Sequence, residues 1–111
     1  METISFDDFL KVQIMVGTIL SAKINPKAIK PAFTLEIDFG SLGIRKSSAQ
    51  ITEHYSDKKL IGQQVLAVVN FEPKKIAGVT SEVLVLAIVS EQEGTILIQP
   101  QRKVTNGSRV L

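Results

Sequence analysis

Few residues in this sequence could carry out catalysis. His54 is the only histidine, and no carboxylate pair at helical spacing accompanies it, which favours a solvated or capping imidazole over a metal ligand. Glu36 and Asp38 alternate with apolar residues, as solvated carboxylates on the outer face of a strand do. Ser47 has no Gly-x-Ser-x-Gly turn around it, and the absence of cysteine removes thiol nucleophiles and thiolate metal sites. We therefore expect a protein that is not an enzyme and that binds no metal or cofactor.

The basic residues suggest a binding function instead. The chain has 13 lysines and arginines against 11 carboxylates, a formal net charge of only +2. The basic residues nevertheless occur in groups, namely Lys23/Lys27/Lys30, Arg45/Lys46, Lys58/Lys59, Lys74/Lys75 and Arg102/Lys103. Because the loops of a small barrel converge on few faces, several groups could merge into one positive surface, with scattered solubilising charge as the alternative. With one tyrosine and five phenylalanines, structured RNA is a better expected ligand than stacked single strands.

Short apolar segments between glycines and prolines predict the elements that would position these residues. Val, Ile and Thr number 11, 13 and 7, which makes 31 β-branched residues in 111 and indicates an all-β fold. Ser5 is expected to cap a short helix, and a helical turn is expected at residues 51–55. Alternation predicts a long strand whose inner face is Ile14, Val16, Thr18, Leu20, Ala22 and Ile24, with a bulge or bend at Gly17. Further strands are expected at residues 33–39, 44–48, 64–71, 83–89 and 95–99, with a basic loop at 72–78.

These elements predict one domain over residues 1–111. Five main strands, with a helical element between the third and the fourth, are the order of a five-stranded Greek-key OB-fold barrel, here with a short N-terminal helix and extra C-terminal strands. The longest apolar run, residues 83–89, has seven residues, whereas a membrane span needs about 20. The first residues lack the basic and apolar parts of a secretory signal. We therefore expect a soluble cytoplasmic protein that does not insert into membranes.

Apolar side chains gather near the two ends of the chain. They are Phe6, Phe9, Leu10, Val110 and Leu111. A monomer of this size would have difficulty covering them, and exposed apolar residues of this kind mark interfaces. Since a two-fold dimer is the commonest arrangement, we expect a homodimer, with packing of the ends onto their own barrel as the alternative.

Seven motifs resemble the CsaA family of protein-secretion chaperones, which belongs to the wider tRNA-binding OB-fold family found free-standing and appended to aminoacyl-tRNA synthetases. The resemblance extends from about Phe6 to Arg109. The motifs are Val16-Gly17-Thr18-Ile19, Ile37-Asp38-Phe39-Gly40, Lys46-Ser47-Ser48-Ala49-Gln50-Ile51-Thr52, Leu60-Ile61-Gly62, Val68-Val69-Asn70-Phe71, Pro73-Lys74-Lys75-Ile76-Ala77-Gly78 and Ser81-Glu82-Val83-Leu84-Val85-Leu86. The stretch from Ser47 to Ile51 is typical of CsaA.

The resemblance implies a homodimeric chaperone that binds unfolded exported preproteins and contacts the export ATPase. The alternative is a tRNA-binding protein that uses the basic face of the barrel. In the tRNA-binding relatives, the third strand and the loop before the fifth contact RNA. Carried to this chain, the RNA- or peptide-binding residues are Arg45, Lys46, Ser47, Ser48, Gln50, Asn70, Lys74, Lys75, Ser81 and Glu82.

Several of these residues have a structural alternative. Asn70 could hold the turn before Pro73, and Ser81 and Glu82 could fix the start of the fifth strand. Lys74 and Lys75 are the strongest functional candidates, since a charged pair in a loop contributes little to stability.

Overall fold

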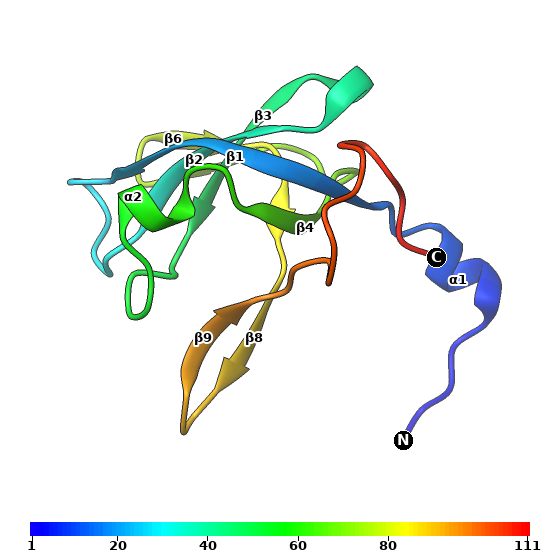
Figure 1. Cartoon of the computed structure of the whole chain (residues 1–111). Coiled ribbons are helices and arrows are strands. Elements are labelled where there is room, and N and C mark those ends of the chain that lie inside the picture. The colour runs from blue at the N-terminus through cyan, green and yellow to red at the C-terminus, as the bar shows by residue number, and fades with distance from the viewer.

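Five strands follow one another around a nearly closed barrel in the order β3-β2-β1-β4-β7, which is the strand order of an OB-fold. The computed structural model describes residues 1–111 and is shown in Figure 1. Its elements are α1 (Phe6–Leu10), β1 (Ile14–Ile24), β2 (Phe33–Asp38), the 3-10 helix η1 (Gly40–Leu42), β3 (Ile44–Ala49), α2 (Asp57–Leu60), β4 (Gln64–Val68), β5 (Lys74–Ile76), β6 (Val79–Ser81), β7 (Leu84–Val85), β8 (Ala87–Ser90) and β9 (Gly94–Leu97). The longest run of α-helix has five residues, and no helix could span a bilayer.

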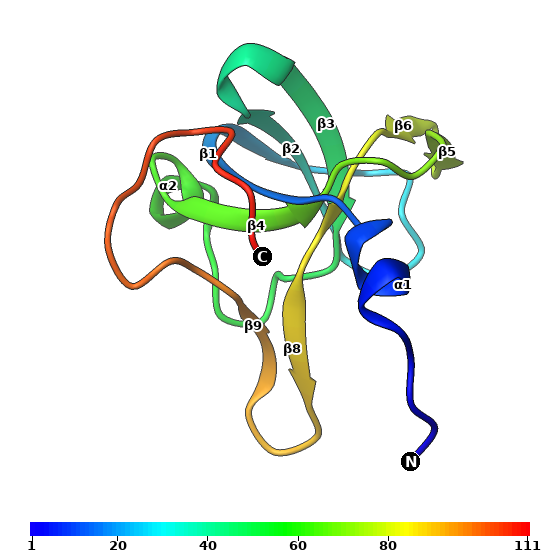
Figure 2. The same cartoon turned by 90° about the vertical axis from the view of Figure 1, so that its right-hand side faces the viewer.

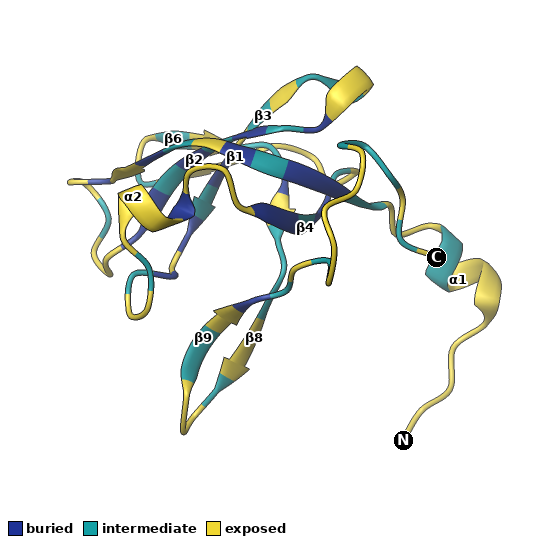
Figure 3. Ribbon diagram, in the orientation of Figure 1, coloured by how far each residue is buried: buried dark blue, intermediate teal, exposed yellow.

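The central strand β2 has the alternation that the sequence predicts. Phe33, Leu35 and Ile37 are buried, and the residues between them are partly exposed. Phe39, immediately after the strand, is also completely buried. Figure 3 shows that the buried residues concentrate in the barrel strands, whereas the N-terminal arm and the β8–β9 hairpin are largely exposed. The barrel core is therefore built around the inner face of β2.

Strand β1 departs from the predicted pattern at two points. Its register against β2 shifts between Ile19 and Ser21, so the bulge lies at Leu20 and not at Gly17. Because a bulge inserts one extra residue, Ile19 and Ala22 both point into the core, while Leu20 is exposed. The predicted single inner face, which included Leu20 and Ile24, is therefore wrong.

Gly17 serves close packing. An added Cβ at this position would lie 2.6 Å from Cγ2 of Ile37 and 2.8 Å from the ring of Phe39. The bare backbone of Gly17 lets these two core side chains approach β1.

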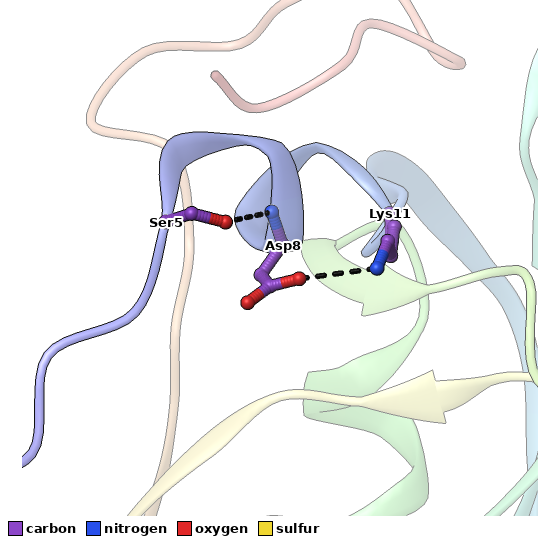
Figure 4. Close-up of polar contacts among 3 residues, drawn as sticks. All are labelled: Ser5, Asp8 and Lys11. Carbon is purple, nitrogen blue, oxygen red and sulfur yellow. Dashed lines mark hydrogen bonds and ion pairs between the residues drawn. The ribbon is translucent and has the colours of Figure 1, made fainter.

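The two short helices begin at serine caps. The Ser5 side chain accepts a hydrogen bond from the Asp8 N–H (3.1 Å), and Lys11 pairs with the Asp8 carboxylate (Figure 4). The helical turn predicted at residues 51–55 is instead α2, where Ser56 accepts from the Lys59 N–H (3.3 Å). The capping serine decides where the helix begins, and the residues before it form a turn.

Two predicted segments are divided differently in the structure. Residues 83–89 are not one strand, because β7 completes the barrel beside β4 and the chain then leaves the barrel to pair β8 with β9. The segment at residues 72–78 is not an open loop, because Lys74–Ile76 pairs with Val79–Ser81 as a hairpin. Its two-residue turn has positive φ angles at Ala77 (48°) and Gly78 (82°), as a type I′ turn requires.

The C-terminal residues 107–110 run along the first half of β1. The Val16 N–H donates to the Ser108 carbonyl (2.9 Å), and the Val110 N–H donates to the Ile14 carbonyl (2.9 Å). Arg109 donates from its guanidinium to the Leu10 carbonyl (2.8 Å). Val110 therefore packs on its own chain, whereas Phe6 and Leu111 remain 70% and 80% exposed.

Candidate peptide and nucleic-acid interface

The β5–β6 hairpin separates two hollows on the surface of the barrel. The first, of about 330 Å³, lies between the hairpin and β7. Its lining consists of apolar side chains with a polar and charged rim, namely Phe71, Ile76, Val83 and Leu84 with Glu72, Lys74, Ser81 and Glu82. Phe71 is 58% and Leu84 49% exposed, so apolar surface here is open to a ligand. An apolar floor with a few polar groups around it is the usual composition of a binding site.

The second hollow, of about 510 Å³, lies between the hairpin and the loop at residues 25–32. Its lining carries two cations and two polar side chains, namely Lys27, Lys30, Ser48 and Gln50, together with Ala28, Ile29, Ala32, Ile76 and Ala77. In OB-folds, the loop between the first two strands and the loop between the last two flank the oligonucleotide-binding face. The hollow lies between the corresponding segments of this chain.

A buried asparagine fixes the hairpin to this loop. The Asn25 side chain donates to the Ala77 carbonyl (3.2 Å) and accepts from the Lys27 N–H (3.0 Å). Sequence reasoning missed Asn25, because its partner lies 52 residues away. The contact places Lys27 against the hairpin turn, where a Cβ added to Gly78 would be 3.3 Å from Cδ of Lys27.

The candidate residues of β3 divide between two faces. Lys46 and Ser48 pair with Glu36 and Thr34 on the outer face, whereas Ser47 pairs with Leu35 and is completely buried. Arg45 is half-buried opposite Ile37. The structure therefore places Lys46 and Ser48 on the surface beside the hairpin, and Ser47 in the core.

Three further candidates have their polar atoms engaged by the backbone. The Asn70 amide accepts from the Gln13 N–H (3.0 Å) and donates to the Lys11 carbonyl (2.7 Å), so it holds the segment before β1 and not the turn before Pro73. The Ser81 hydroxyl accepts from the Ser48 N–H (3.1 Å). The Glu82 carboxylate accepts from the Lys46 N–H (3.0 Å). Ser81 and Glu82 thus join the chain before β7 to the edge of β3.

The basic groups do not form one surface. Lys74 and Lys75 are on β5, at the right of Figure 2, and the loop bearing Lys27 and Lys30 contacts that hairpin. Lys58/Lys59 on α2 and Arg102/Lys103 in residues 98–106 lie on the opposite side, at the left of the same view. The only ion pair in the chain joins Lys11 to Asp8. The cations near the hairpin and those on the opposite side therefore have no neutralising partner.

The comparisons with known proteins agree with this architecture. A family model described as a putative tRNA binding domain matches residues 14–109. The chaperone CsaA of Bacillus anthracis is 47% identical, with a TM-score of 0.94 over 99% of this chain and 100% of that one. The CsaA chaperone protein of Picrophilus torridus is 42% identical, with a TM-score of 0.91 over 98% and 100% of the two chains.

Longer enzymes contain a similar segment. The methionine–tRNA ligase of Methanococcoides burtonii is 37% identical over 107 residues, which are 96% of this chain but 16% of the ligase. The chain thus spans about a sixth of the ligases it matches. Taken with the CsaA-typical motif on β3 and the OB-fold strand order, these matches show that the chain belongs to the tRNA-binding-domain family, within which it resembles the CsaA chaperones.

Proposed function

We propose that this chain is a non-enzymatic, homodimeric binding protein of the CsaA type that holds unfolded segments of exported preproteins. The observation that carries this proposal is the apolar hollow beside the β5–β6 hairpin, where Phe71 and Leu84 leave apolar surface open. An unfolded chain presents the large apolar side chains that such a floor would cover. The resemblance to CsaA makes the export ATPase an expected second partner.

The β8–β9 hairpin supports a dimer. It pairs with no other strand, and Ile88 and Val89 on β8 are exposed. The β9 side of the hairpin contacts the turn at residues 51–55, where Tyr55 accepts from the Leu97 N–H, and further packing against the exposed β8 side would stabilise it. The N-terminal arm, with the Phe6 and Phe9 rings 6.3 Å apart, projects from the same side of the barrel (Figures 1 and 2). A second copy of the chain would cover both features.

The second hollow, between the β5–β6 hairpin and the loop at residues 25–32, favours tRNA as a second candidate ligand. Lys27 and Lys30 line it, Lys74 and Lys75 are on the adjacent strand, and none forms an ion pair. Cations of this kind contact phosphates, and no aromatic residue lines this hollow, which favours structured RNA over stacked single strands.

Salt dependence separates the two ligands. Binding of a labelled, unfolded preprotein and of labelled bulk tRNA would be measured by fluorescence anisotropy between 50 and 200 mM salt. About six phosphate contacts predict a log–log slope near −5, hence roughly a thousandfold loss of affinity over this range. Peptide held in an apolar hollow should weaken far less and should bind with a negative heat-capacity change.

Matched substitutions test the apolar hollow. Phe71→Ser should weaken preprotein binding by about tenfold, because it removes the largest apolar contact of the floor. Ile61→Ser, which changes a similarly exposed apolar residue next to α2, should leave it unchanged. Equal preprotein affinity in the Phe71→Ser variant and the unaltered protein would contradict the proposed peptide site.

A further inference from the structure

The second group of basic residues surrounds a polar region on the side of the barrel away from the β5–β6 hairpin. Two hollows, of about 190 and 440 Å³, both have Gln63 in their walls. Arg102 and Lys103 line the smaller of these two hollows, and Lys58 and Lys59 line the larger. We call these four cations and Gln63 the Gln63 surface. Figure 2 shows its elements, α2 and residues 98–106, on the side opposite the hairpin.

The chemistry of the Gln63 surface fits phosphates better than apolar ligands. No carboxylate lines either hollow, and none of the four cations forms an ion pair. Apart from Gly62 and Pro100, the residues that line the smaller hollow are polar or charged, and most of them are glutamines. Cations together with amide groups are the side chains that contact the phosphates and sugars of nucleic acids.

The segment that bears Arg102 and Lys103 is fixed although it has no helix or strand. The nearly buried Gln64 side chain donates to the Val104 carbonyl (2.7 Å) and accepts from the Val104 N–H (3.0 Å). At the start of the segment, the Gln99 amide donates to Gln63 Oε1 (2.9 Å) and to the Gln64 carbonyl (2.8 Å). The two cations therefore lie between fixed points, which lowers the entropy lost when they bind a ligand.

We propose that the Gln63 surface is a second RNA-binding surface, which contacts the phosphate backbone of structured RNA independently of the hairpin. Structured RNA is favoured because the four cations suit the phosphates of a folded backbone, and the only aromatic rings that line the two hollows are those of His54 and the half-buried Tyr55. The inference extends the tRNA-binding candidate and is independent of preprotein binding. One molecule would then contact RNA on two opposite sides.

The test compares charge reversals at equal net charge. Lys58→Glu/Lys59→Glu, Arg102→Glu/Lys103→Glu and Lys74→Glu/Lys75→Glu each change the formal net charge by four, from +2 to −2. Affinity for labelled bulk tRNA and its salt slope would be measured for each. On the Gln63 surface, each pair should cost about tenfold in affinity and reduce the magnitude of the slope by about 2, since each phosphate contact contributes about 0.9. Unchanged affinity and slope in both of these pairs would overturn the inference, whatever the hairpin variant does.

Site-specific crosslinking distinguishes contact from a general effect of charge. The chain has no cysteine, so Gln101→Cys, in the wall of the smaller hollow, gives a single attachment point for a photoreactive label. It should crosslink tRNA, whereas the same label at Ser41→Cys, exposed on η1, should not. Absence of a crosslink from position 101 would overturn the inference.

Two controls keep the result interpretable. Arg102→Gln/Lys103→Gln removes two positive charges without adding carboxylates. If Arg102→Glu/Lys103→Glu fails to fold, this neutral variant replaces it, and the magnitude of its salt slope should also fall. Failure of the unaltered protein to bind tRNA at 50 mM salt would overturn the inference and leave preprotein binding unaffected, so the two proposals fail separately.

Discussion

Glu82 makes both of the backbone hydrogen bonds that Lys46 offers at the outer edge of β3. Its N–H donates to the Lys46 carbonyl (2.8 Å), and its carboxylate accepts from the Lys46 N–H (3.0 Å). The side chain thereby takes the place of a second backbone carbonyl where β3 meets the chain before β7. This pairing joins the two ends of the five-stranded sheet and helps to close the barrel.

Glu82→Ala should therefore destabilise the fold. It removes the hydrogen bond to the Lys46 N–H at the exposed edge of β3, which should lower the free energy of unfolding by about 1 kcal/mol. Glu82→Gln retains an acceptor oxygen and should cost less. Urea unfolding measures both variants, and an unchanged midpoint in Glu82→Ala would show that the barrel closes without this contact.

Gly17→Ala should be destabilising through overpacking. The new methyl group would lie within 2.8 Å of the Phe39 ring, and insertion into a packed core costs about 1–3 kcal/mol. In a double-mutant cycle, Phe39→Leu should cost less in the Gly17→Ala background than alone, because the smaller side chain relieves the clash. Additive losses in unfolding free energy would contradict this contact.

The hairpin turn should respond in opposite directions to changes at its two residues. Ala77 has a positive φ, which costs alanine more than asparagine, so Ala77→Asn should stabilise the protein by about 0.5 kcal/mol. Gly78→Ala places a Cβ at φ 82° and should destabilise it by about 1 kcal/mol. Thermal unfolding measures the pair, and a shift of the same sign in both would be inconsistent with a type I′ turn.

The proposed dimer predicts that polar substitution on β8 yields monomers. Ile88→Ser with Val89→Ser removes apolar surface from the projecting hairpin, and sedimentation velocity at micromolar concentration should then show a single protomer. Ile29→Ser alters a fully exposed apolar residue in the loop at 25–32 and should leave the dimer intact. If the unaltered protein sediments as a monomer, the proposed homodimer is contradicted.

The sequence was most informative where a strand has one buried face. In β2, Phe33, Leu35 and Ile37 alternate with polar residues because only one face of the strand packs on the core. The predicted burial of these three residues was confirmed. The bulge at Leu20 carries no local signal, since no glycine or proline marks it and Leu20 is an ordinary apolar strand residue. The run at 83–89 is uniformly apolar, so the pattern could not show that the chain leaves the barrel near Leu86.

The surface was harder to predict than the fold. Basic pairs are visible in the sequence, but their division between opposite sides depends on how the chain folds. The amides of Asn25 and Gln64 position two of the basic segments through backbone partners at least 40 residues away. Such contacts have no periodicity that a sequence pattern could reveal.

The pairing of residues 107–110 with β1 has a consequence for synthesis on the ribosome. The Val16 N–H donates to the carbonyl of Ser108, which lies 92 positions further along the chain. A nascent polypeptide therefore cannot complete the pairing of β1 until every other strand has emerged. Contacts over such separations slow folding. The barrel should therefore acquire its final form late, after translation has passed Val110, and until then one edge of the first half of β1 would stay unpaired.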